Sequence, residues 1–260
     1  LPFNCANVTE IPQSECEALV ALYESTDGDN WYNNNGWLET NTPCSWFGVT
    51  CAYEQVVQLR LRGNNLRGTL PGEIGNLTAL VSLDLSELTV YDPVLQIRLN
   101  YITSLPEEIG NLSNLKYIDL GMNRLTNIPA RIGELSSLIR LNLRFSFIAT
   151  LPKEIGNLST LTHLDLYAAD LITLPMEIGN LSELTTLDLG YNDLIALPFE
   201  IGNLTKLTRL VLDNNKLTGS TPSWISNLTA LQYLDLSRNQ FAGPIPTEIG
   251  TLSALTQLNL

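Results

Sequence analysis

Residues 161–183 read LTHLDLYAADLITLPMEIGNLSE, and residues 184–206 read LTTLDLGYNDLIALPFEIGNLTK. The second stretch repeats the first, with aliphatic residues at positions one, four, six and eleven. The same phrase recurs from residue 56 onward, and its first positions are Val56, Leu80, Leu115, Leu138, Leu161, Leu184, Leu207, Leu231 and Leu255. The spacing is 23 residues in the middle and mostly 24 outside it. A fixed period of this length predicts a solenoid in which each unit forms one coil.

Each unit is predicted to contain a short strand and a short helical turn. Apolar and polar residues alternate at Leu164-Asp165-Leu166, as in a strand with one buried face. An asparagine follows and is expected to hydrogen-bond backbone groups in a ladder between coils. These ladder residues are Asn64, Asn123, Asn192, Asn215 and Asn239. Pro152 then presets a helical turn that Gly156 is expected to end.

Because such crossovers link consecutive strands, the strands must run parallel, and the wider helical side curves the stack with strands on the concave wall. From residue 56 to the end, the chain resembles leucine-rich repeat proteins. Units with LRGTLP at 66–71, LTGSTP at 217–222 and FAGPIP at 241–246 resemble the plant-type extracellular subclass. The four central units resemble the 23-residue class of bacterial and intracellular proteins. The resemblance implies an α/β fold: a right-handed leucine-rich repeat solenoid with short helical or 3-10 turns on the convex face.

Two regions are therefore expected, a cap over residues 1–55 and an array of about nine units over 56–260. The cap resembles the one that precedes plant-type repeats, with an amphipathic α-helix at 15–23 followed by Trp31, Trp37 and CSWFGVTC at 44–51. The tryptophans are predicted to cover the core of the first coil, with a carbohydrate platform as the less favoured alternative. The sequence stops in mid-strand at 258–260 without a closing cap, which indicates a longer parent protein or an end open for association.

The four cysteines all lie in the cap, at Cys5, Cys16, Cys44 and Cys51. This placement predicts two disulfides and an oxidising compartment. Three pairings are possible, and short loops favour Cys5 with Cys16 and Cys44 with Cys51. A zinc site would need tighter C-x-x-C spacing, so no metal is expected.

Composition excludes several classes of function. A formal charge of -13 opposes nucleic-acid binding, which needs clustered Lys and Arg. No apolar run is long enough for a membrane helix, and the start lacks a signal-peptide pattern, so a mature, soluble chain is expected. His163 and Asp165 share a strand face, but no nucleophile is placed beside them, and no phosphate-binding loop occurs. Neither enzymatic activity nor a cofactor is expected.

The candidate ligand-binding residues lie where the ladder pattern fails, because Ser146 and Ala169 occupy ladder positions. An alanine has no amide, which indicates either a recognition patch or drift in a tolerant array. The predicted patch contains Arg140, Arg144, Phe145, His163 and Tyr167, and the same wall continues with Tyr117, Tyr191, Arg209 and Tyr233. Aromatic and Arg side chains dominate interface energetics.

An acidic row also follows the strands, at Asp84, Asp119, Asp165, Asp188 and Asp235. It is interpreted as a cation site or a track for a basic ligand, or as usual family phrasing with solvated or paired carboxylates, and the second interpretation is favoured.

Two further features concern the surface. The unit that starts at Leu80 carries 12 extra residues, with Ser86 to Ile97 as the expected insertion, which either shapes a binding surface or is a neutral loop. Asn-x-Ser/Thr sequons predict glycans for a eukaryotic secretory route, and they occur at Asn7, Asn76, Asn111, Asn157, Asn180, Asn203 and Asn227.

The sequence thus predicts a non-enzymatic recognition module, secreted or on the cell surface, that binds a protein or peptide across its concave strand face. One alternative is an inhibitor of a secreted polysaccharide hydrolase. Another is a structural or adhesive array that self-associates, because the oligomeric state is left open. The resemblance implies receptor ectodomains, polygalacturonase-inhibiting proteins or bacterial surface proteins as settings.

Overall fold

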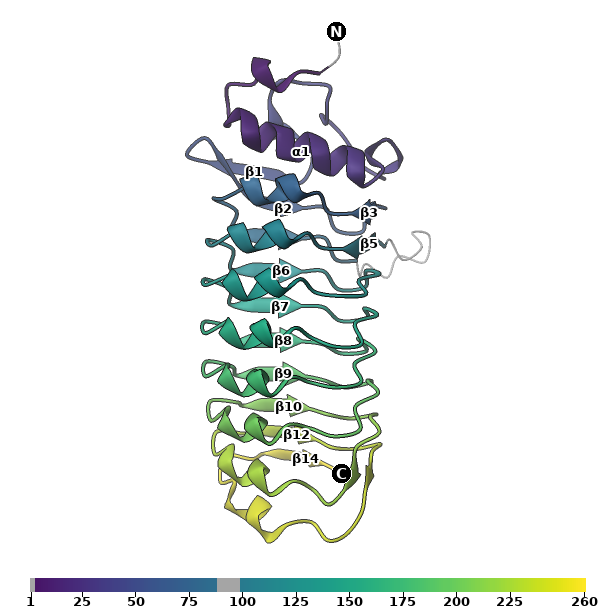
Figure 1. Ribbon diagram of the computed structural model, residues 1–260, viewed down its shortest axis with the longest axis vertical. Coiled ribbons are helices and arrows are strands. Elements are labelled where there is room, and N and C mark those ends of the chain that lie inside the picture. The colour runs from purple at the N-terminus through teal and green to yellow at the C-terminus, as the bar shows by residue number, and fades with distance from the viewer. Residues whose placement is uncertain (1–2, 88–98) are drawn as a thin grey trace.

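The computed structural model describes residues 3–87 and 99–260. A ten-stranded sheet runs the length of the molecule (Figure 1). Its strands are β1 (Val49–Ala52), β2 (Gln55–Arg60), β4 (Ser82–Asp84), β6 (Tyr117–Asp119), β7 (Arg140–Asn142), β8 (His163–Asp165), β9 (Thr186–Asp188), β10 (Arg209–Val211), β12 (Tyr233–Asp235) and β14 (Gln257–Asn259). From β2 onward every neighbouring pair is parallel, whereas the cap strand β1 is antiparallel to β2. The predicted solenoid is confirmed.

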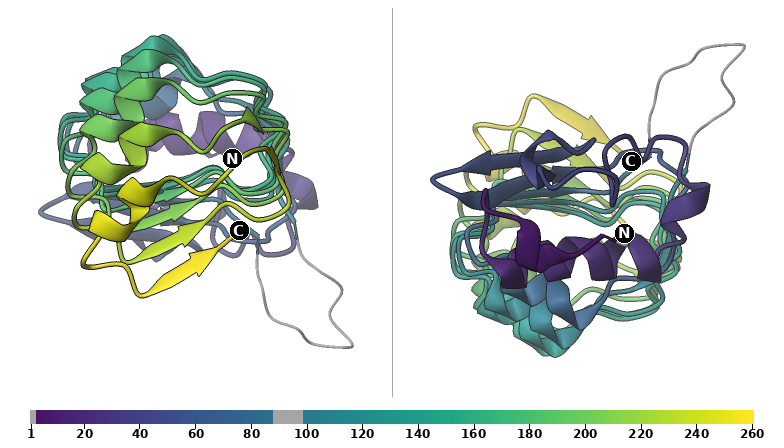
Figure 2. Two further views of the ribbon diagram at one scale, coloured as in Figure 1. Left: turned by 90° about the horizontal axis from the view of Figure 1, so that it is seen from below. Right: turned by 90° about the horizontal axis from the view of Figure 1, so that it is seen from above.

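Short 3-10 turns form the opposite wall, as the views along the axis show (Figure 2). They are η4 (Gly72–Asn76), η5 (Glu107–Asn111), η6 (Ala130–Glu134), η7 (Lys153–Asn157), η8 (Met176–Asn180), η9 (Phe199–Asn203), η10 (Ser223–Asn227) and η11 (Thr247–Thr251). Each follows a proline, whose fixed φ suits the first turn. The repeat's aliphatic side chains fill the space between the walls, and Leu164 and Leu187 are fully buried.

The glycine that recurs in seven of the eight turns, all except η10, has a different role from the predicted one. Gly156 lies inside η7 and does not end it. A Cβ on Gly156 would overlap the backbone carbonyl of Glu177 in the next coil, and a Cβ on Gly179 would overlap that of Glu200. The glycine therefore permits the close approach of neighbouring turns.

This packing predicts that Gly179→Ala lowers the free energy of unfolding by about 2 kcal/mol, because backbone on the facing coil must shift. Gly250 is the matched control. It occupies the same repeat position in η11, and an added Cβ there meets nothing within 4 Å. Gly250→Ala is expected to be neutral or slightly stabilising. Urea denaturation of both variants checks the difference, and equal effects would contradict the packing argument.

The asparagine ladder holds consecutive coils together. The Asn192 side-chain oxygen accepts from the N–H groups of Ala169 and Leu171 at 3.0 and 2.9 Å. Its amide nitrogen donates to the carbonyls of Leu166 and Leu189, both at 2.9 Å. The predicted ladder is therefore present, and one further ladder residue, Asn100, bonds in the same way.

Other hydrogen bonds take over part of the missing amide's role at the two exceptions, a backbone bond at Ala169 and a hydroxyl bond at Ser146. The Ala169 carbonyl accepts from Ile148 N–H at 2.8 Å, a bond that a ladder amide makes elsewhere. Asp170, which follows Ala169, has a φ of 61°, whereas Asp193, at the equivalent position of the next coil, has no positive φ. This left-handed conformation is uncommon for residues other than glycine and turns the backbone locally. Ser146 keeps one bond, from its hydroxyl to the Leu143 carbonyl at 2.7 Å.

The extra residues of the Leu80 unit lie between Ser86 and Asn100. Ser86 keeps the regular register because its carbonyl accepts from Gly63 N–H at 2.8 Å. Asn100 takes the ladder position of this unit. Most of the predicted insertion, residues 88–97, lies outside the described residues.

Small second sheets form on the flank at the units with the plant-type phrase, and the first of these sheets also includes the neighbouring Leu80 unit. There β3 (Arg67–Thr69) pairs with β5 (Tyr101–Ser104), and β11 (Thr218–Gly219) pairs with β13 (Gln240–Phe241). The central 23-residue units have no such strand in the part of the chain that is described. The mixture of two repeat types in the sequence therefore corresponds to two kinds of coil.

The cap consists of helix α1 (Gln13–Ser25) and the short turns η1 (Cys5–Asn7), η2 (Gly28–Asn30) and η3 (Pro43–Ser45). Disulfides join Cys5 to Cys16 and Cys44 to Cys51, which confirms the predicted pairing. The cap tryptophans are buried in contact with one another, so they belong to the core and do not form an exposed carbohydrate platform. Glu15, also buried, accepts a hydrogen bond from Val56 N–H at 2.7 Å and ties the helix to the first coil.

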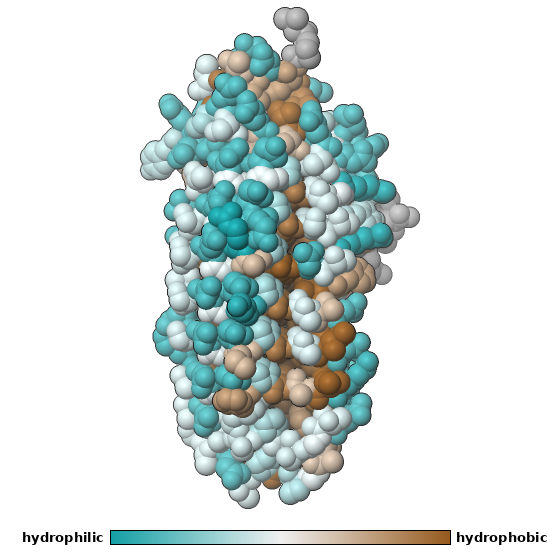
Figure 3. All heavy atoms as spheres, in the orientation of Figure 1, coloured by the Kyte–Doolittle hydropathy of each residue, from teal (hydrophilic) through white to brown (hydrophobic). Residues whose placement is uncertain are grey.

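The turn wall carries exposed polar and apolar groups. All seven sequon asparagines are exposed, and each is the last residue of a 3-10 turn, Asn7 in the cap and the other six on the turn wall. Four apolar side chains of two consecutive coils are also exposed, namely Ile172, Met176, Ile195 and Phe199. Figure 3 shows apolar side chains that protrude in the lower half of the molecule. Apolar surface therefore lies in the same coils as the sequons at Asn180 and Asn203.

Candidate recognition surface

One row of side chains crosses the strand face at the first residue of each short strand. The register pairs Tyr117 with Arg140, Arg140 with His163 and His163 with Thr186. The row continues through Arg209 to Tyr233. Because adjacent strands lie about 4.8 Å apart, these side chains form a fixed linear array. Equal positions in the repeat therefore place six side chains on one line, namely Tyr117, Arg140, His163, Thr186, Arg209 and Tyr233.

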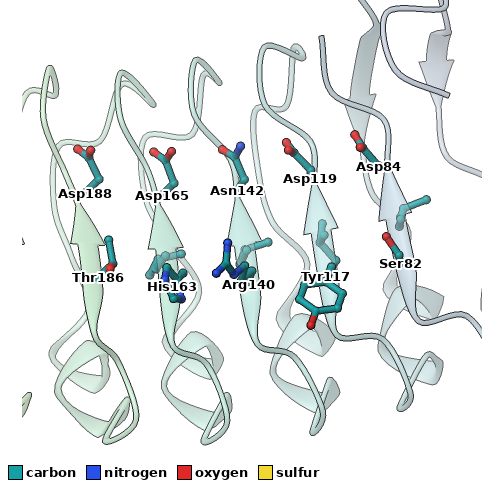
Figure 4. A pocket seen from close by; sticks show the side chains of 14 residues that line it. Ser82, Asp84, Tyr117, Asp119, Arg140, Asn142, His163, Asp165, Thr186 and Asp188 are labelled. Atoms are coloured by element: carbon teal, nitrogen blue, oxygen red, sulfur yellow. The ribbon is translucent and has the colours of Figure 1, made fainter. Parts of the chain in front are cut away.

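A hollow of about 390 Å³ lies over β4, β6, β7, β8 and β9. Figure 4 shows two rows of side chains that line it, one row containing Tyr117, Arg140 and His163. The other row is formed by Asp84, Asp119, Asn142, Asp165 and Asp188. Ser82, Asn142 and Thr186 line the hollow but were not among the predicted residues. Their repeat positions were the signal that could have found them.

Burial alters the ionisation of the acidic row. Burial raises the pKa of Asp188 to about 6, and the Asp165 carboxylate on the adjacent strand adds to the shift. Burial also raises the pKa of Asp165 and of Asp119. At Asp235, burial acts in the same direction, but hydrogen bonds from Asn259 and Ser237 outweigh it and lower the pKa. A negative charge on Asp188 therefore opposes folding, whereas a negative charge on Asp235 favours it.

Asp188→Asn is expected to stabilise the protein by about 1 kcal/mol at pH 7.5, after allowance for solvent screening. A carboxyl whose folded pKa is raised to about 6 opposes folding when it ionises. This cost is absent below the unfolded pKa near 4 and grows as the pH rises through about 6. The stabilisation should therefore disappear at pH 3.5. Urea denaturation at both pH values measures it.

Asp235→Asn is the control from the same repeat position. Its depressed pKa means that the charge stabilises the fold above the unfolded pKa, so this substitution should destabilise at pH 7.5. If the two variants shift stability in the same direction at pH 7.5, the electrostatic account of the row is wrong.

A second group of predicted residues forms an aromatic ridge at the bend after the strands. We define the aromatic ridge as Arg144, Phe145, Tyr167 and Tyr191. The Tyr167 ring centroid lies 5.4 Å from that of Phe145 and 5.0 Å from that of Tyr191. The Arg144 guanidinium lies 5.0 Å from the Phe145 ring and 5.7 Å from the Tyr167 ring, within cation–π range.

Two glycines make room for the ridge. A Cβ on Gly121 would lie 2.9 Å from Cγ of Arg144, and a Cβ on Gly190 would lie 3.1 Å from Cδ2 of Tyr167. Phe145 and Tyr191 have φ of 52° and 55°, and hydrogen bonds to the next coil hold both bends. The ridge is therefore fixed by the stack of coils before any ligand arrives.

The remaining predicted residues pair with each other. The Arg209 guanidinium lies 3.9 Å from the centre of the Tyr233 ring, and the Tyr233 hydroxyl donates to Asp235 at 3.1 Å. The structure thus divides the predicted wall into three parts. Tyr117, Arg140 and His163 line the hollow, the ridge lies beyond the acidic row, and the Arg209–Tyr233 pair lies outside both.

The side chains on this surface are suited to contacting a partner. His163 Nδ1 lies 2.8 Å from the Thr162 hydroxyl, and burial together with the Arg140 charge lowers the pKa of His163. Among the described residues, no cluster of three or more His, Cys, Asp or Glu side chains is arranged to hold a metal ion. No helix within residues 3–87 and 99–260 is long and apolar enough to cross a membrane.

Comparison with curated proteins gives partial matches to plant receptors. A probable inactive receptor kinase of Arabidopsis thaliana is 36% identical over 100 residues, which are 38% of this chain and 13% of that protein. The MALE DISCOVERER 1 protein of Arabidopsis thaliana is 52% identical over 44 residues, 17% of this chain and 6% of that protein. The chain thus matches only a small part of these relatives.

Solved structures match over more of the chain. The plant peptide hormone receptor RGFR1, in complex with RGF2, is 34% identical with a TM-score of 0.68, covering 77% of this chain and 31% of that one. The GASSHO1/SCHENGEN3 ectodomain of Arabidopsis thaliana, in complex with CASPARIAN STRIP INTEGRITY FACTOR 2, is 30% identical with a TM-score of 0.67, covering 93% of this chain and 31% of that one.

Family models agree with the architecture. The Leucine rich repeat N-terminal domain model matches residues 12–52, and the Leucine Rich Repeat model matches residues 55–77. The Leucine-rich repeat region model matches residues 94–172 and 152–260, more than half of the chain. The chain therefore belongs to the leucine-rich repeat family and carries that family's N-terminal cap.

Proposed function

We propose that this protein is a non-enzymatic extracellular recognition module whose strand face binds a protein or peptide. The observation that carries the proposal is the aromatic ridge beside the hollow. The ridge is assembled from three coils, its rings pack on one another, and glycines leave the space that its side chains occupy. Such a surface loses little conformational entropy when a ligand binds, so more of the contact energy remains as affinity.

The residue types support an interface. Tyr and Arg are the side chains most often responsible for binding energy in protein interfaces. Phe145 and Tyr191 are 37% and 38% exposed, so their rings are available to a partner. The neighbouring hollow adds polar groups from both rows that can hydrogen-bond an extended backbone.

The related structures support the same class of ligand. The solved complexes named above hold a receptor ectodomain or hormone receptor with its peptide or factor. The two disulfides are in keeping with an extracellular compartment. An inhibitor of a polysaccharide hydrolase would use the same face and remains the second candidate.

The proposal is tested by capture of partners from the native extracellular fluid on the immobilised chain, followed by mass spectrometry. Tyr167→Ala should weaken the captured partner at least about tenfold, because it removes the central ring of the ridge. Thermal unfolding should change only modestly, since the Tyr167 ring is partly exposed and contacts side chains of the ridge. Tyr53→Ala is the control, because Tyr53 is 97% exposed and lies in the cap.

If Tyr167→Ala and Arg140→Ala both bind the partner like the wild type, the strand face is not the recognition surface. A captured hydrolase whose activity falls at stoichiometric ratios would favour the inhibitor.

A further inference from the structure

A row of cations and rings lies on the flank of the solenoid, where β3 and β5 pair (Figure 1). The Arg67 guanidinium lies 5.1 Å from the Tyr101 ring centroid, and that of Arg124 lies 4.8 Å from it. The three residues come from three successive coils. Backbone bonds fix their order, because Arg67 pairs with Tyr101 and Arg124 N–H donates to the Ile102 carbonyl at 2.9 Å.

A hollow of about 170 Å³ opens beside this row. We call it the flank pocket. Its apolar walls come from Leu99, Tyr101, Met122, Phe145 and Phe147, and Arg124 lies at its edge. Phe147 is 54% exposed, although it is a large apolar side chain. An apolar cavity of about 150 Å³ holds one benzene molecule, so the flank pocket has room for one large apolar side chain.

The charge around the flank pocket is opposite to that of the whole chain. The formal net charge is -13, yet no acidic side chain lines the pocket among the described residues. Within the same residues, neither Arg67 nor Arg124 forms an ion pair with a carboxylate. Arg67 instead donates to the Asn65 side chain at 3.1 Å, and Arg124 is exposed above Tyr101. Both guanidinium groups can still accept an anionic partner.

We propose that the flank pocket is a second binding site, which shares only Phe145 with the aromatic ridge and takes an acidic peptide segment. A large apolar side chain of the peptide enters between Phe145 and Phe147. A carboxylate next to it pairs with Arg124 while that guanidinium remains stacked on Tyr101. The apolar walls supply affinity, and the guanidinium selects the sign of the neighbouring charge.

Two synthetic peptides test the proposal on the full chain. They are acetyl-Gly-Asp-Phe-Asp-Gly-amide and acetyl-Gly-Lys-Phe-Lys-Gly-amide, titrated and followed by calorimetry or NMR. We expect the acidic peptide to bind at least about tenfold tighter. Bulk electrostatics would give the reverse order for so acidic a chain, so this preference is diagnostic. A version of the acidic peptide with Ser in place of Phe should not bind.

Variants locate the binding. Arg124→Glu should reverse the preference between the peptides, and Phe147→Ser should weaken both at least about tenfold. Lys153→Glu makes the same charge change on the turn wall and should leave the preference intact. Arg140→Ala alters the hollow on the strand face, away from every residue that lines the flank pocket, and should also leave the preference intact, so failure here and failure of the proposed function can be told apart.

The proposal is overturned if the basic peptide binds as tightly as the acidic one, if neither binds at about millimolar concentration, or if Phe147→Ser leaves binding unchanged. Melting temperatures of the variants show whether they are folded. Should Phe147→Ser fail to fold, the reversal by Arg124→Glu decides the question.

Discussion

Replacing Asn192 with alanine is expected to lower the free energy of unfolding by about 4 kcal/mol. The Asn192 amide satisfies two backbone N–H groups and at least two carbonyls inside the core. Each buried group that loses its partner costs about 1–3 kcal/mol, and partial relaxation keeps the total below the sum of all four. Urea denaturation followed by circular dichroism measures the change.

A graded series isolates the cause. Ser146→Ala removes one bond at the equivalent position and should cost about 1 kcal/mol. Asn127→Ala changes an exposed asparagine for which the described residues give no hydrogen bond, and it should be neutral. In a stack of coils, loss of one interface can also let the distal coils unfold first, as a separate transition at lower urea. An Asn192→Ala protein as stable as Asn127→Ala would show that the ladder does not hold the coils together.

The regular part of the fold could be predicted because each coil uses the same core packing and the same hydrogen bonds. Buried positions such as Leu164 need an aliphatic residue and leave a signal in every unit, and the ladder position of Asn192 needs an amide and leaves a signal in most units. The disulfide pairing followed from loop length alone. The glycine of the turn was predicted as a helix end because its actual constraint, the facing carbonyl of the next coil, appears only when coils are stacked.

The exceptions could not be predicted for a related reason. Alanine at position 169 carries no signal for its replacement bond, since that bond uses the backbone carbonyl. The positive φ of Asp170 accompanies that bond, whereas the positive φ of Ala168 is shared by the equivalent residue of coils that keep the asparagine, such as Tyr191.

The sequence predicted the residues of the candidate site, but it did not predict their separation into the hollow, the aromatic ridge and the Arg209–Tyr233 pair. Neighbouring units at equal repeat positions must lie side by side, so Tyr117, Arg140 and His163 were grouped correctly on one wall. The alternation of a strand does not show where the strand ends and the bend begins. Arg144 and Phe145 lie past that bend, and the acidic row separates them from the hollow. The ridge contacts also depend on Gly121, which has no signal of its own.

Trp37→Ala should destabilise the cap by about 3–5 kcal/mol, the range for truncation of a large buried aromatic side chain. Trp37 is 2% exposed, and its ring centroid lies 4.9 Å from that of Trp31 and 5.0 Å from that of Trp46. Its indole N–H also donates to the Phe47 carbonyl at 2.9 Å, so the substitution removes a hydrogen bond along with the packing.

The consequence of Trp37→Ala should extend beyond the cap, because the cap covers the core of the first coil. Helix α1 packs on η4, and Glu15 bonds to Val56 at the start of the array. Once the cap opens, Leu59 and Leu61, both fully buried in the intact protein, lose their cover. We therefore expect the variant to bind an apolar dye and to aggregate on mild heating, whereas Tyr53→Ala should do neither. Limited proteolysis distinguishes unfolding of the cap alone from unfolding of the whole chain. Cleavage confined to residues 3–55 would mean that the array stays folded without its cap. That result would contradict the coupling expected for a stack of coils.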